Sequence, residues 1–138
     1  MIPVVKTMKP DSKRLCRLLE STSKSLSRDP LDARPLGQLR RQLRESINSR
    51  LSASSPTEDS DVVVVEYILL RILDDMWASF SGTVSAIVPR YKMRGMLNAV
   101  ATSLKNLSDS LERGDVSSCY KSYSSLLSIF LNMLKEGE

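Results

Sequence analysis

Histidine is absent from this 138-residue chain, which limits the chemistry that its other side chains can perform. A serine or cysteine nucleophile of the usual kind therefore has no histidine base, and zinc lacks one of its principal ligands. Cys16 and Cys119 lie in opposite halves of the chain, and neither belongs to a CxxC pair, so they do not indicate a zinc site. We interpret them as buried, reduced thiols, and a disulfide remains the alternative.

Two Ser-x-x-Lys strings, Ser21–Lys24 and Ser118–Lys121, have the spacing of the nucleophile and lysine in penicillin-recognising enzymes. Because 23 of the 138 residues are serine, such strings arise by chance, and no companion motif accompanies them. The chain also has no glycine-rich phosphate loop. We predict a protein without catalytic residues, metal site or cofactor, and therefore not an enzyme.

Basic residues grouped at helical spacing are a more specific signal. The groups are Lys13 with Arg17, Arg40 with Arg41 and Arg44, and Arg90 with Lys92 and Arg94. Cations four residues apart on a helix repel each other unless an anion neutralises them. A bound phosphate would supply that anion, and so would a neighbouring acidic helix. For Arg40 and Arg44 the sequence leaves both alternatives open.

The third basic group stands in the first turn of a predicted helix. Free backbone amides there attract anions, so Arg90, Lys92 and Arg94 are candidate phosphate ligands. Tyr91 lies between them and can stack on an unpaired base. The alternative is that these cations face solvent or contact the acids at 74–75.

Charge is distributed unevenly along the chain, whose net charge is +4. Residues 1–50 hold twelve basic and five acidic residues, and residues 51–88 hold one basic and six acidic. Such blocks predict a basic face that attracts the nucleic-acid backbone. The competing interpretation is that the acidic segment neutralises the basic helices within the fold.

Residues 88–105, VPRYKMRGMLNAVATSLK, resemble the central signature of the small helical subunits of type III CRISPR effector complexes. The likeness rests on Val-Pro at 88–89, Gly-Met-Leu at 95–97 and Lys105. The gap between proline and glycine is one residue shorter here, and Thr102 replaces an aromatic. The resemblance implies an all-helical basic subunit without catalysis, stacked in a filament beside guide RNA and target strand. It also implies backbone-binding roles for the third basic group.

Helices must position these residues, because apolar periodicity close to 3.6 runs through the whole chain. We expect helices over about 12–26, 35–51 and 61–88, a fourth that ends at Gly114, and a fifth that Asp115 caps. The expected core stripes are Leu15, Leu19, Thr22 and Leu26; Leu36, Leu39, Leu43, Ile47 and Leu51; Met93, Leu97, Val100, Leu104, Leu107 and Leu111; and Val116, Tyr120, Tyr123, Leu127, Phe130 and Leu134. The last two stripes predict an antiparallel helical hairpin.

The third expected helix is apolar almost all round, which predicts that it is the central element. Four consecutive valines at 62–65 favour a strand by propensity, but no second strand exists to pair with them, so a strand is the minor alternative. We expect Gly82 to bend this helix and Pro89 to end it. The most apolar stretch of this helix, Val62 to Leu73, is interrupted by Glu66 and Arg71 and is too short to cross a membrane.

These observations together predict an all-α protein: a compact bundle of about five helices with a C-terminal antiparallel hairpin, in one domain over 1–138. Residues 1–10 are expected to be a flexible N-terminus without a signal peptide, and residues 52–60 a mobile loop. The fifth helix carries further apolar residues that need another helix or another subunit, and we assign them to an oligomer interface: Leu126, Ile129, Phe130 and Met133.

The function favoured by the sequence is a non-enzymatic, cytoplasmic subunit that binds single-stranded RNA or DNA backbone within a larger assembly, with little sequence specificity. The predicted nucleic-acid contacts are Lys13, Arg17, Arg40, Arg41, Arg44, Arg90, Lys92 and Arg94, with Tyr91 for stacking. The alternative is a protein–protein adaptor or homo-oligomeric scaffold that does not bind nucleic acid.

Overall fold

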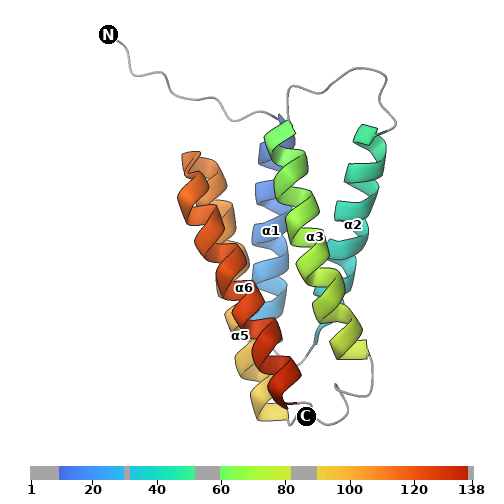
Figure 1. Ribbon diagram of the computed structural model, residues 1–138, viewed down its shortest axis with the longest axis vertical. Helices are drawn as coiled ribbons and strands as arrows, with labels where there is room; N and C mark the ends of the chain where they lie inside the picture. The colour runs from blue at the N-terminus through green and yellow to red at the C-terminus, as the bar shows by residue number, and fades with distance from the viewer. Residues whose placement is uncertain (1–9, 30–31, 52–59, 82–89, 137–138) are drawn as a thin grey trace.

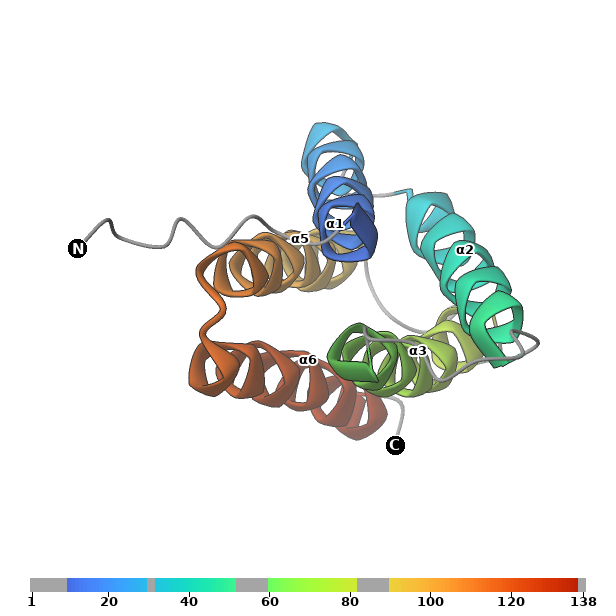
Figure 2. The ribbon, with the colours of Figure 1, turned by 90° about the horizontal axis from the view of Figure 1, so that it is seen from above.

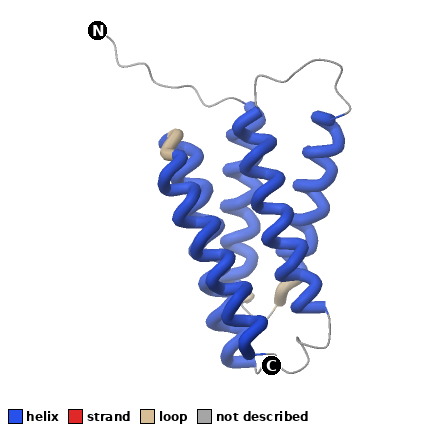
Figure 3. Tube along the Cα trace, in the orientation of Figure 1, coloured by secondary structure: helices blue, strands red, loops and turns tan. Residues whose placement is uncertain are grey.

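The computed structural model describes residues 10–29, 32–51, 60–81 and 90–136, and helices make up nearly all of them. They are α1 (Pro10–Arg28), α2 (Arg34–Leu51), α3 (Ser60–Ser81), α5 (Arg90–Arg113) and α6 (Val116–Glu136). Figure 3 shows no strand in the described part of the chain, which confirms the all-α prediction. The four valines at 62–65 lie within α3.

Several expectations fall on residues that lie outside this description. They are the flexible N-terminus, the loop after residue 51, the bend at Gly82 and the helix end at Pro89. Pro10 and Ser60, which were expected in the first two of these segments, begin α1 and α3 instead.

The helices lie side by side as a bundle whose long axes are roughly aligned (Figure 1). Viewed from above, they form a ring in the order α1, α5, α6, α3 and α2 (Figure 2). Contacts between α1 and α5, α5 and α6, α6 and α3, α3 and α2, and α2 and α1 close this ring. The core is the space that the five helices enclose.

A tight turn joins α5 to α6 and makes the C-terminal pair a hairpin. Gly114 has φ 66°, the left-handed conformation that favours glycine after a helix. The Gly114 amide donates to the Leu111 carbonyl over 3.1 Å, and the Asp115 amide donates to the Ser110 carbonyl over 2.9 Å. Asp115 then caps α6, because its carboxylate accepts from the Ser118 amide and hydroxyl over 3.2 and 2.7 Å. The stop at Gly114 and the cap at Asp115 are thus confirmed.

Three of the four predicted apolar stripes form the core. On α1, α2 and α5 the described members of these stripes are buried, apart from half-buried Leu111. The prediction succeeds because the apolar residues of these stripes recur at helical spacing. They therefore share one face of each helix, and that face packs against the other helices.

α3 is not the central element that its apolar sequence predicts. It occupies one place in the ring, between α2 and α6 (Figure 2). Its outward face leaves Val64 and Tyr67 more than half exposed, and Arg71 and Asp75 on the same face are exposed. A ring of five helices gives every helix an outer face, so a helix that is apolar nearly all round exposes some of its apolar side chains.

The predicted stripe of α6 is only partly correct. Tyr123 is buried as expected, but Tyr120 is 73% exposed and Leu127 45% exposed. The buried face is rotated around the helix and instead includes Cys119 and Leu126. α6 packs against both α5 and α3, so the side chains that are buried are those that face these two helices.

Both cysteines are free and buried, in agreement with the interpretation of Cys16 and Cys119 as thiols within the core. Burial raises the pKa of each thiol above its ordinary value. Among the helices as far as they are described, none is long and apolar enough to span a bilayer.

Candidate nucleic-acid interface

The outward face of α1 carries a row of cations. Lys13, Arg17, Lys24 and Arg28 are all exposed, and their spacing of four, seven and four residues places them on one side of the helix. Arg14, also exposed, flanks this row. At a rise of about 1.5 Å per residue, the row is about 22 Å long. We call Lys13, Arg17, Lys24 and Arg28 the α1 basic row.

Packing against α5 fixes which side of α1 faces solvent. The Ser23 hydroxyl donates to the Ala101 carbonyl over 2.7 Å, and the Ser108 hydroxyl donates to the Cys16 carbonyl over 3.3 Å. Both bonds join a side chain to the backbone of the other helix, so the small serines hold the two backbones close together. The basic row lies on the side of α1 that is opposite its buried leucines, and it cannot turn inward while these bonds persist.

A groove between α1 and α5 lies beside Lys24 and Arg28, the C-terminal half of the α1 basic row. It is lined by Glu20, Ser23, Lys24, Ser27, Arg28 and Lys105. Three of these side chains are cationic, and the Ser27 hydroxyl is exposed among them. Hydroxyl, ammonium and guanidinium donors are the groups that contact phosphate oxygens in protein–nucleic acid interfaces.

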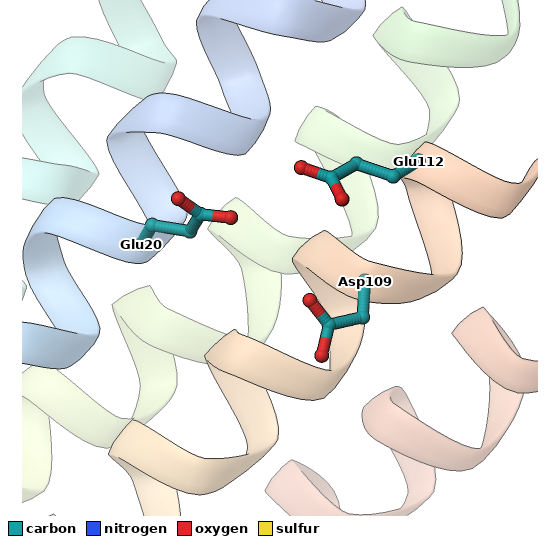
Figure 4. A group of neighbouring side chains, drawn as sticks. All are labelled: Glu20, Asp109 and Glu112. Carbon is teal, nitrogen blue, oxygen red and sulfur yellow. The ribbon is translucent and has the colours of Figure 1, made fainter.

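Three carboxylates gather between the middle of α1 and the C-terminal end of α5 (Figure 4). Glu20 of α1 points toward Asp109 and Glu112 of α5, and one oxygen from each lies within 4.8 Å of the others. Lys105 donates to Asp109 over 3.0 Å and lies 3.7 Å from Glu20. The hydrogen bond to Asp109 raises the pKa of Lys105. Carboxylate oxygens are suitable ligands for a divalent cation, but here Lys105 already neutralises two of the three.

The arginines of α2 have an internal anion. Arg40 Nε donates to Asp74 Oδ1 of α3 over 2.7 Å, and an Arg44 guanidinium nitrogen donates to Asp74 Oδ2 over 3.0 Å. The Arg40 guanidinium also lies over the Trp77 ring, 5.4 Å from its centre. The sequence leaves two sources for the neutralising anion, a bound phosphate and a neighbouring acidic helix. The structure shows the second, because Asp74 belongs to α3. Arg41, the third member of this group, is exposed on α2.

The third basic group lies at the start of α5. Arg94 is exposed and Lys92 is half-buried, while the side chains of Arg90 and Tyr91 lie outside the described part of the structure. Ser23 lies opposite Ala101, and Arg94 is seven residues back along α5. Since α1 and α5 are antiparallel, Arg94 lies at the end of the pair where α1 finishes with Arg28.

The predicted clusters therefore do not form one surface. Arg40 and Arg44 turn toward α3, whereas Arg94 lies on α5, and α1 separates α2 from α5 in the ring (Figure 2). Lys13 and Arg17 belong to the α1 basic row. Sequence reasoning missed Lys24 and Arg28, although their spacing from Arg17, seven and eleven residues, is also that of a single helix face.

Burial corrects one member of the predicted oligomer interface on α6. Leu126 is fully buried in the core of a single chain, so it is not available to a partner. Ile129 and Phe130 are half-buried against the same core, and the side chain of Met133 is not described. Contact of α6 with both α5 and α3 accounts for the burial of Leu126, Ile129 and Phe130, which is the other explanation that the sequence allows.

Comparison with known proteins adds no relative: no family model matches the chain, and neither the curated proteins nor the solved structures contain a significant match. The resemblance of residues 88–105 to small CRISPR effector subunits remains a prediction that rests on its own residues.

Proposed function

We propose that this protein is a non-enzymatic subunit that binds nucleic-acid backbone through the outward face of α1. The observation that carries the proposal is the α1 basic row. Its four exposed cations have no ion-pair partner among the described residues. Glu20, the only acid on α1 whose side chain is described, turns aside toward α5.

A phosphate backbone suits such a row better than a single small anion does. The cations are spread over about 22 Å of helix, a length that accommodates several successive phosphates. Few exposed aromatic residues accompany them, so contacts to bases are few. Affinity is then electrostatic, and sequence preference is weak.

The test is fluorescence anisotropy with labelled single-stranded and duplex RNA and DNA at about 50 and 200 mM salt. The decisive variant changes Lys13, Arg17, Lys24 and Arg28 to glutamine, which is a good helix former and leaves the core untouched. On a single strand, each lost phosphate contact lowers the slope of log K against log salt by about 0.7, so the full variant lowers it by up to about 2.8.

A matched control changes Arg71, Arg113, Lys121 and Lys135 to glutamine. These four cations are also exposed, none lies on α1, and both variants lower the net charge from +4 to zero. We expect the control to keep most of the salt slope. Equal losses in the two variants would refute the assignment to α1. Absence of binding at the lower salt would refute nucleic-acid binding itself and leave the adaptor alternative.

A further inference from the structure

Exposed apolar side chains are concentrated on α6. Among the large apolar residues in the described part of the chain, Tyr120 is 73% exposed, Leu127 45% and Leu131 58%. With Ser124, which is also exposed, they are spaced four, three and four residues apart, so they form one stripe along the helix. We call Tyr120, Ser124, Leu127 and Leu131 the α6 outer stripe.

Charge is scarce around this stripe. The exposed charged side chains described on α6 are Lys121 and Lys135 alone. Apolar surface continues from the stripe onto α3, because Val64 and Ile68 line a groove together with Tyr120 and Tyr123. An apolar centre with few charges distinguishes the core of a protein interface from ordinary surface.

The α6 outer stripe and the α1 basic row belong to helices that are not neighbours in the ring. α1 and α6 are on opposite sides of the ring (Figure 2). Two copies of a chain with net charge +4 repel each other least when they meet through α6, because the α1 basic rows then point away from each other.

We propose that the α6 outer stripe is the interface with a second copy of this chain, packed antiparallel about a two-fold axis. The spacing four, three, four reads the same in both directions, so an antiparallel copy matches every member of the stripe with another member. Tyr120 then lies opposite Leu131 of the second copy, and Ser124 lies opposite Leu127 of the second copy. A two-fold interface requires this kind of self-complementarity.

Charge at the two ends of α6 agrees with this register. Asp115 precedes the first turn of α6, and Lys135 lies in its last turn. In the antiparallel pair, the end of each helix that carries Asp115 lies at the end of the other helix that carries Lys135, so opposite charges attract at both ends of the pair. The small side chain of Ser124 lets the helices approach near the two-fold axis, so that Leu127 of the second copy fills the space above it.

The test is sedimentation velocity of the full chain without nucleic acid, from about 5 to 500 µM. We expect the mass to rise with concentration toward twice the 15.4 kDa of one chain. The double variant Leu127→Glu, Leu131→Glu should weaken the association by at least tenfold. The control Ser125→Glu, Asn132→Glu adds the same charge at exposed positions of α6 outside the stripe and should keep the dimer. Thermal melting by circular dichroism checks that both variants fold.

Orientation is tested with a nitroxide on Ser117→Cys, because Cys16 and Cys119 are buried and stay unlabelled. The antiparallel register separates the two labels by about 26 Å along the helix axes, whereas parallel helices would bring them to about 10 Å. A chain that stays monomeric at 500 µM overturns the proposal and assigns the stripe to a different protein. A dimer that tolerates both glutamates, or labels at the short distance, overturns it equally.

Discussion

The ion pair between α2 and α3 leads to a prediction that separates a structural role of the α2 arginines from a functional one. The Asp74 carboxylate forms ion pairs with Arg40 and Arg44, with nitrogen–oxygen distances of 2.7 and 3.0 Å. The Arg40 side chain is 20% exposed and the Arg44 side chain 55% exposed. Arg40 is also confined between Asp74 and the Trp77 ring. Removing Asp74 therefore leaves one guanidinium without its anion in a partly dry position.

The expected cost follows from these exposures. A hydrogen bond to a charged group contributes about 1.5–3 kcal/mol, and partial exposure of both partners reduces the Arg40–Asp74 pair to about 1–1.5 kcal/mol. The more exposed Arg44 pair adds about 0.5 kcal/mol or less. We expect Asp74→Ala to lower the free energy of unfolding by about 1.5–2 kcal/mol, and Arg40→Ala to cost more than Arg44→Ala.

Urea denaturation followed by circular dichroism measures these changes, and a double-mutant cycle isolates each coupling energy. Glu45→Ala is the control, since it removes one exposed acid from α2. Anisotropy with labelled RNA supplies the functional arm. Because Arg40 and Arg44 turn toward α3, Asp74→Ala should leave the salt slope of binding unchanged. Unchanged stability, or a larger coupling for Arg44, would refute the structural argument. A steeper salt slope for Asp74→Ala would indicate that the α2 arginines contact nucleic acid.

Three further predictions concern packing, the thiols and the cap of α6. Gly37→Ala should destabilise the fold by about 1 kcal/mol, because the new Cβ would lie 2.9 Å from the Trp77 ring and the overpacking outweighs the better helix propensity. Gly95→Ala should stabilise the fold by up to about 1 kcal/mol, because a Cβ at this position would have no atom within 4 Å. Urea denaturation measures both changes, and a change of the same sign in the two variants would contradict the packing around Gly37. Pulse alkylation at pH 8, read by mass spectrometry, should modify Cys16 and Cys119 only after unfolding, and rapid labelling of the native chain would exclude their burial. Hydrogen bonds from the hydroxyl and amide of Ser118 lower the pKa of Asp115 below 3.8, so the stabilising charge of this cap persists above that value and is lost as the pH falls through the lowered pKa. As the pH is lowered from 5 to 2, the melting temperature should therefore decrease less in Asp115→Asn than in the parent protein. The same decrease in both proteins would argue against the cap.

Local signals in the sequence determined a large part of the fold. Leucines at helical spacing placed the cores of α1, α2 and α5, since a regular stripe marks the face that must be buried. Glycine followed by aspartate at 114–115 fixed the turn of the C-terminal hairpin, because the left-handed backbone and the cap are both properties of adjacent residues. The valines at 62–65 adopted a helix because the described part of the chain offers no strand to pair with.

The candidate site was only partly accessible to the same reasoning. Lys13 and Arg17 were found because they are one helical turn apart. Lys24 and Arg28 continue the row after a gap that holds Ser21, so a search for adjacent pairs does not connect them. The spacing of cations shows that they share a face, but it does not show which anion lies beside them. Asp74 is thirty-four residues from Arg40 in the chain and 2.7 Å away in the fold.

The sequence by itself determined that this protein is a bundle of amphipathic helices, because helix periodicity, caps and stops are written in residues that are close along the chain. Only the tertiary structure decided which faces the helices cover. An apolar helix such as α6 offers more than one face for burial, and the choice between Leu126 and Leu127 belongs to its neighbours α3 and α5. The same packing neutralised the arginines of α2 and left the basic row of α1 open to solvent, since contacts between distant segments decide which charges meet.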